Sequence, residues 1–324
     1  MEKHGTPMIL KIVFLLLGVF TLGLFAIAYV VFKNSYSRAA HGDEKSNELP
    51  DESWAKKYHE RYINGCLWNQ DVKGEEWAIT SKDGLRLTAK FVPAKGEAVR
   101  NVILAHGYHS VYFKDFSEIA QWHIEHGANV LMICQRSAPG SEGKYLTMGI
   151  RESEDIALWA ALMDDRTLGK LPMYLHGISM GCATVVMAQG EELPANVKGI
   201  IADCGFTSPW DISVAVCRQW YPWLPAKLTG YVVDIYSRHL ANFGLKEKNT
   251  VEILKKAKIP TLFVHGMMDD FVPPHMSVKN YQACAAPKRI MLSEEATHAL
   301  SWFYDKERYV KAMEEFFGWE EKGE

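Results

Sequence analysis

The fold of this chain is decided by residues 172–188, which read PMYLHGISMGCATVVMA. The apolar run Met173–His176 is typical of a buried strand, and the residues after Gly181 favour a helix. Between the two, Gly177, Ser179 and Gly181 fit the pattern G-x-S-x-G, in which glycines permit a tight turn that lifts the serine hydroxyl above a sheet. The segment therefore predicts a strand–turn–helix unit with a serine at the N-terminal end of the helix.

Apolar runs and helical stretches alternate on both sides of this unit. Two strand-like runs, Glu76–Thr80 and Leu85–Phe91, flank Lys82-Asp83-Gly84, which is a hairpin signal. The compact apolar runs that follow are Val99–Ala105, Asn129–Cys134, Met173–His176, Val197–Ala202, Thr261–Val264 and Arg289–Leu292. The helical stretches are Phe113–Glu125, Ser153–Met163, Ser179–Gln189, His275–Ala285 and Leu300–Phe317. This alternation predicts an α/β fold with a mostly parallel central sheet and helices on both faces.

One connection is too long for an ordinary crossover between strands. About fifty residues, from Thr207 to Lys258, separate two predicted strands and contain helical segments of their own. We therefore expect a helical cap insertion at about residues 207–258. As a group, its Trp210, Trp220 and Trp223 are candidate substrate-binding residues, although packing of the cap explains any one of them equally well.

A serine hydroxyl becomes a nucleophile when a histidine removes its proton, and that histidine needs a carboxylate to fix its tautomer. Asp269 follows the predicted strand Thr261–Val264, and His298 follows the last predicted strand. Both lie at C-terminal strand ends, where open α/β sheets place their sites, and in the chain order serine, acid, histidine. The sequence thus predicts Ser179, Asp269 and His298 as catalytic residues.

Acyl transfer also needs an oxyanion hole made of two preorganised backbone N–H groups. Met180, directly after the serine, supplies one of them. The sharp turn His106-Gly107-Tyr108 follows the strand Val99–Ala105 and supplies the other, which we expect to be the N–H of Tyr108.

Together these motifs resemble the α/β-hydrolase superfamily, specifically its serine hydrolases of the esterase, monoacylglycerol lipase and serine aminopeptidase type. The resemblance covers about residues 72–318, and its motifs are His106-Gly107, Gly177–Gly181, His265–Pro273 with Asp269, Thr297-His298, and Gly140–Gly143 followed by Glu152 and Asp155. The chain departs from it at Gln135-Arg136-Ser137, where relatives often have Asp-x-Arg-Gly. That departure affects a structural turn and leaves the triad intact.

The resemblance implies a serine hydrolase that cleaves carboxylic esters through an acyl-enzyme, acts on a small ester or acylated substrate, and uses no cofactor or metal. A peptidase or amidase of the serine aminopeptidase type is the alternative, and a non-catalytic membrane-tethered binding module is a further one. For the acid, the spacing from Gly266 favours Asp269 over its neighbour Asp270. Asp203 remains an alternative because some members of the fold place their acid after the preceding strand.

The N-terminus predicts a membrane segment. Ile12–Phe32 contains no charged residue, is flanked by lysines, and as a helix is about 30 Å long, which matches the hydrocarbon core of a bilayer. Residues 1–33 are therefore expected to be a membrane anchor or signal segment, and residues 34–71 a tether and side helix. With this segment the chain resembles membrane-attached or exported bacterial hydrolases. We expect the catalytic domain outside the cytoplasm, either anchored or secreted after cleavage behind Ala39.

Composition excludes several other classes of protein. The 324 residues are 48% hydrophobic, which rules out wholesale disorder. The 36 basic and 39 acidic residues give a net charge of −3 without a basic stripe, so nucleic-acid binding has no electrostatic support. The six cysteines form no CxxC pair, which indicates buried free thiols and no zinc signature. No obligate protein partner is indicated.

Overall fold

The centre of the molecule is one sheet. In the computed structural model, which describes residues 8–38, 42–51 and 56–318, eight strands pair in the order β1-β2-β4-β3-β5-β6-β7-β8. The strands are β1 (Glu75–Thr80), β2 (Arg86–Val92), β3 (Arg100–Ala105), β4 (Ala128–Ile133), β5 (Met173–Ile178), β6 (Val197–Asp203), β7 (Thr261–Gly266) and β8 (Lys288–Ser293). The β1–β2 and β2–β4 pairs are antiparallel, and all pairs from β4 to β8 are parallel. The mostly parallel sheet predicted from the sequence is confirmed.

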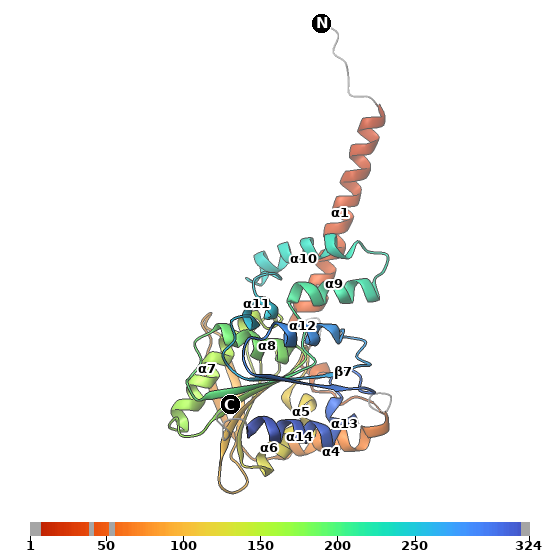
Figure 1. Cartoon of the computed structure of the whole chain (residues 1–324). Coiled ribbons are helices and arrows are strands. Elements are labelled where there is room, and N and C mark those ends of the chain that lie inside the picture. Colours follow the sequence, from red (N-terminus) through yellow and green to blue (C-terminus); the bar gives the residue numbers. More distant parts are fainter. Residues whose placement is uncertain (1–7, 39–41, 52–55, 319–324) are drawn as a thin grey trace.

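Helices cover both faces of this sheet (Figure 1). One face packs against α4 (His59–Asp71), α5 (Tyr112–Asp115), α6 (Ser117–Glu125), α13 (Ser301–Tyr304) and α14 (Lys306–Phe317). The other packs against α7 (Ile150–Arg166), α8 (Met180–Met187), α11 (Thr250–Leu254) and α12 (His275–Ala283). The remaining elements are α1 (Met8–Tyr36), α3 (Asp43–Asn47), η1 (Lys56–Tyr58), η2 (Ala188–Gly190), α9 (Pro209–Trp220) and α10 (Ala226–Leu240). An apolar core results on each side of the sheet, and a further apolar cluster joins α1, α8 and the cap.

Two helices predicted as continuous are each broken in the structure. The stretch Phe113–Glu125 divides into α5 and α6 at Phe116, and Leu300–Phe317 divides into α13 and α14 at Asp305. At Asp305 the backbone has φ −141° and ψ 46°, which lies outside the helical region. Since both halves of each stretch keep an apolar face toward the sheet, the sequence pattern alone does not show the break.

Three of the helices lie above the C-terminal edge of the sheet. Helices α9 and α10 lie beside the C-terminal end of α1, and the N-terminal part of α1 projects away from the rest of the molecule (Figure 1). The sequence predicted a tether from residue 34, but α1 continues to Tyr36, and Ser37 forms a bridge with Tyr145. Ala28 and Phe32 are 0% exposed because they pack against the body of the protein. The helix is therefore built into the domain at its C-terminal end.

Helix α4 is attached to the core through one carboxylate. Glu118 on α6 accepts hydrogen bonds from Arg61 on α4 at 2.7 and 2.9 Å, from Lys306 at 2.8 Å and from Trp302 at 3.0 Å. Burial by itself raises the pKa of Glu118, but these donors outweigh it and lower the pKa to about 2, from an ordinary value of 4.5. Ionised Glu118 therefore joins three segments that are distant in sequence.

This ion cluster predicts a pH-dependent loss of stability. Because the pKa of Glu118 is lower in the folded chain than in the unfolded one, its contribution is present above pH 4.5 and disappears as the pH falls toward 2. We expect Glu118→Gln to reduce the free energy of unfolding by about 1–2 kcal/mol at pH 7, and by progressively less below pH 4.5. Thermal unfolding of the full chain in detergent measures it, with the exposed Glu315→Gln as control. Equal stability of Glu118→Gln and wild type at pH 7 would contradict the assignment.

Candidate active site

Ser179 occupies a strained turn between β5 and α8. Its backbone has φ 57° and ψ −117°, a conformation that residues other than glycine rarely adopt. The glycines around it are required by close backbone contacts. A Cβ on Gly181 would lie 1.8 Å from the carbonyl oxygen of Ala105, and one on Gly177 would lie 2.1 Å from that of Gly181. The turn predicted from the sequence is therefore packed directly against the end of β3.

This contact predicts a large cost for the smallest possible substitution. We expect Gly181→Ala to destabilise the chain by about 3 kcal/mol or more, because the added carbon overlaps a backbone oxygen that cannot rotate away. Thermal unfolding compares it with Gly190→Ala, where the nearest atom would lie 3.8 Å from the added carbon. Similar melting temperatures for the two variants would show that β3 and α8 are not packed as described.

Three side chains meet above this turn in one hydrogen-bonded row. The Nε2 atom of His298 lies 2.9 Å from the Oγ of Ser179, and its Nδ1 atom lies 2.7 Å from Oδ2 of Asp269. Asp269 follows β7 and His298 follows β8, so neighbouring parallel strands bring both to the same edge of the sheet. The structure therefore brings together the serine, histidine and acid that the sequence singled out.

The carboxylate of Asp269 is held in place from several directions. Its Oδ1 accepts the backbone N–H groups of Phe271 at 2.9 Å and Val272 at 2.8 Å, and its Oδ2 lies 3.1 Å from Nε2 of His265. Burial raises the pKa of Asp269, but the hydrogen bonds of His265 and His298 outweigh it and hold the pKa well below its ordinary value. Asp269 is thus an ionised, oriented partner for His298.

The two alternative acids lie in other environments. Asp203 ends β6 and accepts a hydrogen bond from the hydroxyl of Tyr309 at 3.0 Å, while burial raises its pKa to about 6. Its backbone oxygen accepts the N–H of Ser179 at 2.9 Å, which supports the turn. Asp270 is exposed, and its backbone oxygen accepts a hydrogen bond from Gln219. The contacts of His298 thus favour Asp269 as the acid.

The loop after β3 lies against the serine. A Cβ built on Gly107 would be 3.2 Å from the Cβ of Ser179, and the N–H of Gly107 donates to Asp115. Tyr108 is the next residue, and its ring lines the space above Ser179. Met180 is the first residue of α8, where N–H groups have no acceptor within the helix. Both N–H groups expected to form an oxyanion hole are therefore carried by segments adjacent to Ser179.

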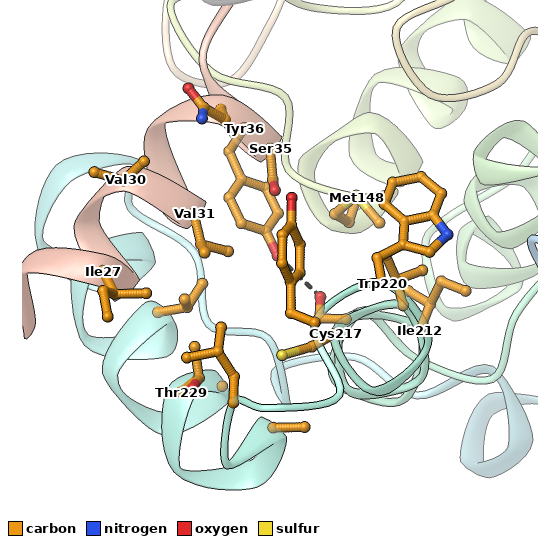
Figure 2. A pocket seen from close by; sticks show the side chains of 18 of the residues that line it. Ile27, Val30, Val31, Ser35, Tyr36, Met148, Ile212, Cys217, Trp220 and Thr229 are labelled. Carbon is orange, nitrogen blue, oxygen red and sulfur yellow. Dashed lines mark hydrogen bonds between the residues drawn. The ribbon is translucent and has the colours of Figure 1, made fainter. Parts of the chain in front are cut away.

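Ser179 lies in the wall of an apolar cavity of about 580 Å³. Trp220 and Trp223 line it, whereas Trp210 does not and packs against Tyr231 and Lys246 instead. Sequence reasoning missed a further group, which comes from the end of α1 and faces the cap across the cavity (Figure 2). This group is Ala26, Ile27, Val30, Val31, Asn34, Ser35 and Tyr36. Its only signal in the sequence was the unusual apolar character of the whole segment.

One set of possible metal ligands overlaps the same residues. In the described ranges, donor atoms of Cys204, Asp269 and His298 lie within 4.8 Å of one another. Two of the three are already hydrogen-bonded to each other, and burial raises the pKa of the Cys204 thiol well above its ordinary value. Because metals bind the thiolate form, this set does not fit a metal site. All six cysteines are free in the structure, and five of them are buried, whereas Cys134 is partly exposed.

Sequence comparisons relate this chain to known proteins. A sequence model of the prolyl oligopeptidase family matches residues 114–322. YqkD of Bacillus subtilis is 25% identical over 69% of this chain and 72% of its own length. The α/β hydrolase domain-containing protein WAV2 of Arabidopsis thaliana is 26% identical over 75% of this chain and 78% of its own length.

Solved structures resemble the fold. The Pyrococcus furiosus esterase Pf2001 superimposes with a TM-score of 0.61 at 20% identity, over 76% of this chain and 93% of that one. An acylaminoacyl peptidase of Pyrococcus horikoshii superimposes with a TM-score of 0.55 at 17% identity. The match covers 77% of this chain and 42% of that one. The predicted fold class is confirmed.

Proposed function

This chain belongs to the prolyl oligopeptidase family, and from that premise we propose that it cleaves carboxylic esters through an acyl-enzyme on Ser179. The family and the α/β-hydrolase fold make it a serine hydrolase, of esterase or peptidase type.

The mechanism follows from the hydrogen-bonded row. The Oγ of Ser179 attacks the ester carbonyl while Nε2 of His298 takes its proton, and Asp269 stabilises the resulting imidazolium. The N–H groups of Met180 and Tyr108 bind the oxyanion. His298 then returns the proton to the leaving alcohol. A water molecule activated by His298 finally releases the acid and restores Ser179.

One observation carries the preference for esters over peptides. Within the described part of the chain, the residues that line the cavity include no aspartate, glutamate, lysine or arginine. The two aspartates of the cap are engaged elsewhere: Asp211 accepts from Thr207 and Ser208, and Asp234 pairs with Arg238. A free amino terminus would thus find no carboxylate in the cavity, which favours an uncharged acyl group.

A matched substrate panel tests this proposal. Purified full-length chain is assayed in detergent on p-nitrophenyl acyl esters and on acyl and aminoacyl p-nitroanilides of equal chain length. We expect a kcat/KM at least about 100-fold higher on the acyl esters than on the aminoacyl anilides, because the cavity offers an apolar surface and no amine anchor. Preferential cleavage of aminoacyl anilides would favour the peptidase alternative. Turnover of neither class would favour a non-catalytic binding module.

We further propose that the chain is a single-pass membrane protein with its hydrolase domain, residues 72–318 with the cap at about 207–258, outside the cytoplasm. Helix α1 is long and apolar enough to span a membrane. Cleavage behind Ala39, which lies outside the described residues, would instead release the domain. Protease treatment of intact cells distinguishes a domain outside the cytoplasm from one inside it. A domain left undigested would contradict the proposed location outside the cytoplasm.

A further inference from the structure

The end of α1 forms one wall of the cavity that contains Ser179. The side chains of Ile27, Val30 and Val31 on α1 lie across from residues of the cap helices α9 and α10, among them Ile212 and Thr229 (Figure 2). The membrane segment and the site of chemistry therefore share one apolar space.

Hydrogen bonds fix α1 in this position. The hydroxyl of Tyr108 donates to the backbone oxygen of Ser35 at 2.7 Å, and Tyr236 on α10 donates to that of Phe25 at 3.2 Å. The hydroxyls of Tyr36 and Ser213 lie 2.9 Å apart. With Ala28 and Phe32 fully buried, these contacts extend over the last three turns of the helix. The helix thus forms a fixed part of the cavity.

The length of α1 places the cap at the membrane. The part of the helix before its contact with the cap, Met8–Gly23, is only about 24 Å long at 1.5 Å per residue, whereas a hydrocarbon core is about 30 Å thick. The apolar run continues to Phe32. A bilayer that covers this run therefore also reaches the turns from Leu24 onward, where α1 contacts α10.

The cap carries a surface suited to that place. Trp220 is 55% exposed, Trp223 69% and Tyr231 52%, and Leu228, Ile235 and Leu240 are also exposed. Tryptophan and tyrosine are enriched where a protein meets the boundary between lipid headgroups and acyl chains. These exposed aromatic and aliphatic side chains on α9, α10 and the segment between them are suited to contact with an apolar phase.

We propose that the cavity receives the acyl chain of a membrane lipid ester, which enters laterally between α1 and the cap from the leaflet at the C-terminal end of α1. This inference rests on the proposed function. The lipid's ester C–O bond breaks as its acyl carbon bonds to Oγ of Ser179, and the lipid alcohol leaves with the proton from His298. Water then releases a fatty acid. The cavity of about 580 Å³ lies within the range of roughly 300–1,000 Å³ that small-molecule sites occupy.

Cavity-filling variants of the full chain test the wall. The chain is reconstituted in phosphatidylcholine vesicles and assayed on 4-methylumbelliferyl butyrate in water and on 4-methylumbelliferyl oleate in the bilayer. Ile27→Trp on α1 and Val216→Trp on α9 narrow the cavity from opposite sides. If one of the two variants does not fold, the other still tests whether the cavity binds the acyl chain. We expect the ratio of kcat/KM for oleate to that for butyrate to fall at least tenfold in both. Val19→Trp, on the same helix but outside the cavity, should change the ratio less than twofold.

The route of entry is tested by the position of the oleate ester. We expect hydrolysis at least ten times faster when the ester is in the same vesicles as the enzyme than when it is supplied in separate vesicles. Equal rates would overturn lateral entry. If the ratio of kcat/KM for oleate to that for butyrate is unchanged in both tryptophan variants while Ser179 is still labelled by a fluorophosphonate, α1 does not form a wall of the acyl site. That result would overturn this inference and leave the proposed function standing. Absence of labelling and of turnover in wild type would overturn the proposed function, and this inference with it.

Discussion

Replacement of Ser179 with alanine is expected to reduce kcat for ester hydrolysis by at least about 10⁴-fold. The reason is that the Oγ of Ser179, 2.9 Å from Nε2 of His298, is the atom that becomes acylated, so its removal leaves the acyl group without an acceptor oxygen. The effect should fall on kcat, since the apolar cavity that binds the acyl group is unchanged. Steady-state kinetics of the full chain on short p-nitrophenyl esters measure it.

The control for this variant is its stability. Alanine keeps the Cβ atom and the same backbone conformation at residue 179, so the melting temperature should stay close to that of wild type. A Ser179→Ala chain that folds and hydrolyses esters at the wild-type rate would show that the reaction does not pass through this serine.

Replacement of Asp269 with asparagine has the second-largest expected effect, a loss of about 10³–10⁴-fold in kcat. An amide in this position cannot stabilise the imidazolium, and its NH₂ group favours the wrong tautomer of His298. The matched control is Asp270→Asn, which alters the adjacent, exposed residue and should change kcat less than twofold. Both are measured with the same ester.

Asp203→Asn completes this comparison. Asp203 contacts Tyr309 in place of His298, so we expect a loss far smaller than that of Asp269→Asn. A larger loss in Asp203→Asn than in Asp269→Asn would mean that the acid is the one at the end of β6, and a larger loss in Asp270→Asn would mean that the acid is the neighbouring residue after β7.

The sheet and the three-residue row were accessible from sequence for a simple reason. Buried parallel strands are short apolar runs, and the turns after them carry the polar residues, so Asp269 and His298 stand out at the ends of β7 and β8. The glycines around Ser179 stand out as well, because neighbouring backbone leaves no room for a side chain: that of Gly181 beside Gly177, and that of Ala105 beside Gly181.

The packing of α1 against the domain could not be predicted from the sequence in the same way. Its buried residues follow at every fourth position, namely Leu24, Ala28, Phe32 and Tyr36. In an ordinary helix such a face is recognised against polar neighbours. Here the neighbours up to Val31 are apolar too, so the pattern contains no contrast. Likewise, nothing local separates Trp210, which packs beside Lys246, from Trp220 and Trp223, which line the cavity.

Fluorophosphonate labelling followed by peptide mass spectrometry tests the central claim most directly. The reagent bonds covalently to a serine that is activated as a nucleophile, and the fragment spectrum identifies the residue. We predict a single adduct on Ser179 in the wild-type chain, much slower labelling in Asp269→Asn, and none in Ser179→Ala. An adduct on another serine, or none on the folded wild-type chain, would contradict the assignment of Ser179 as the nucleophile.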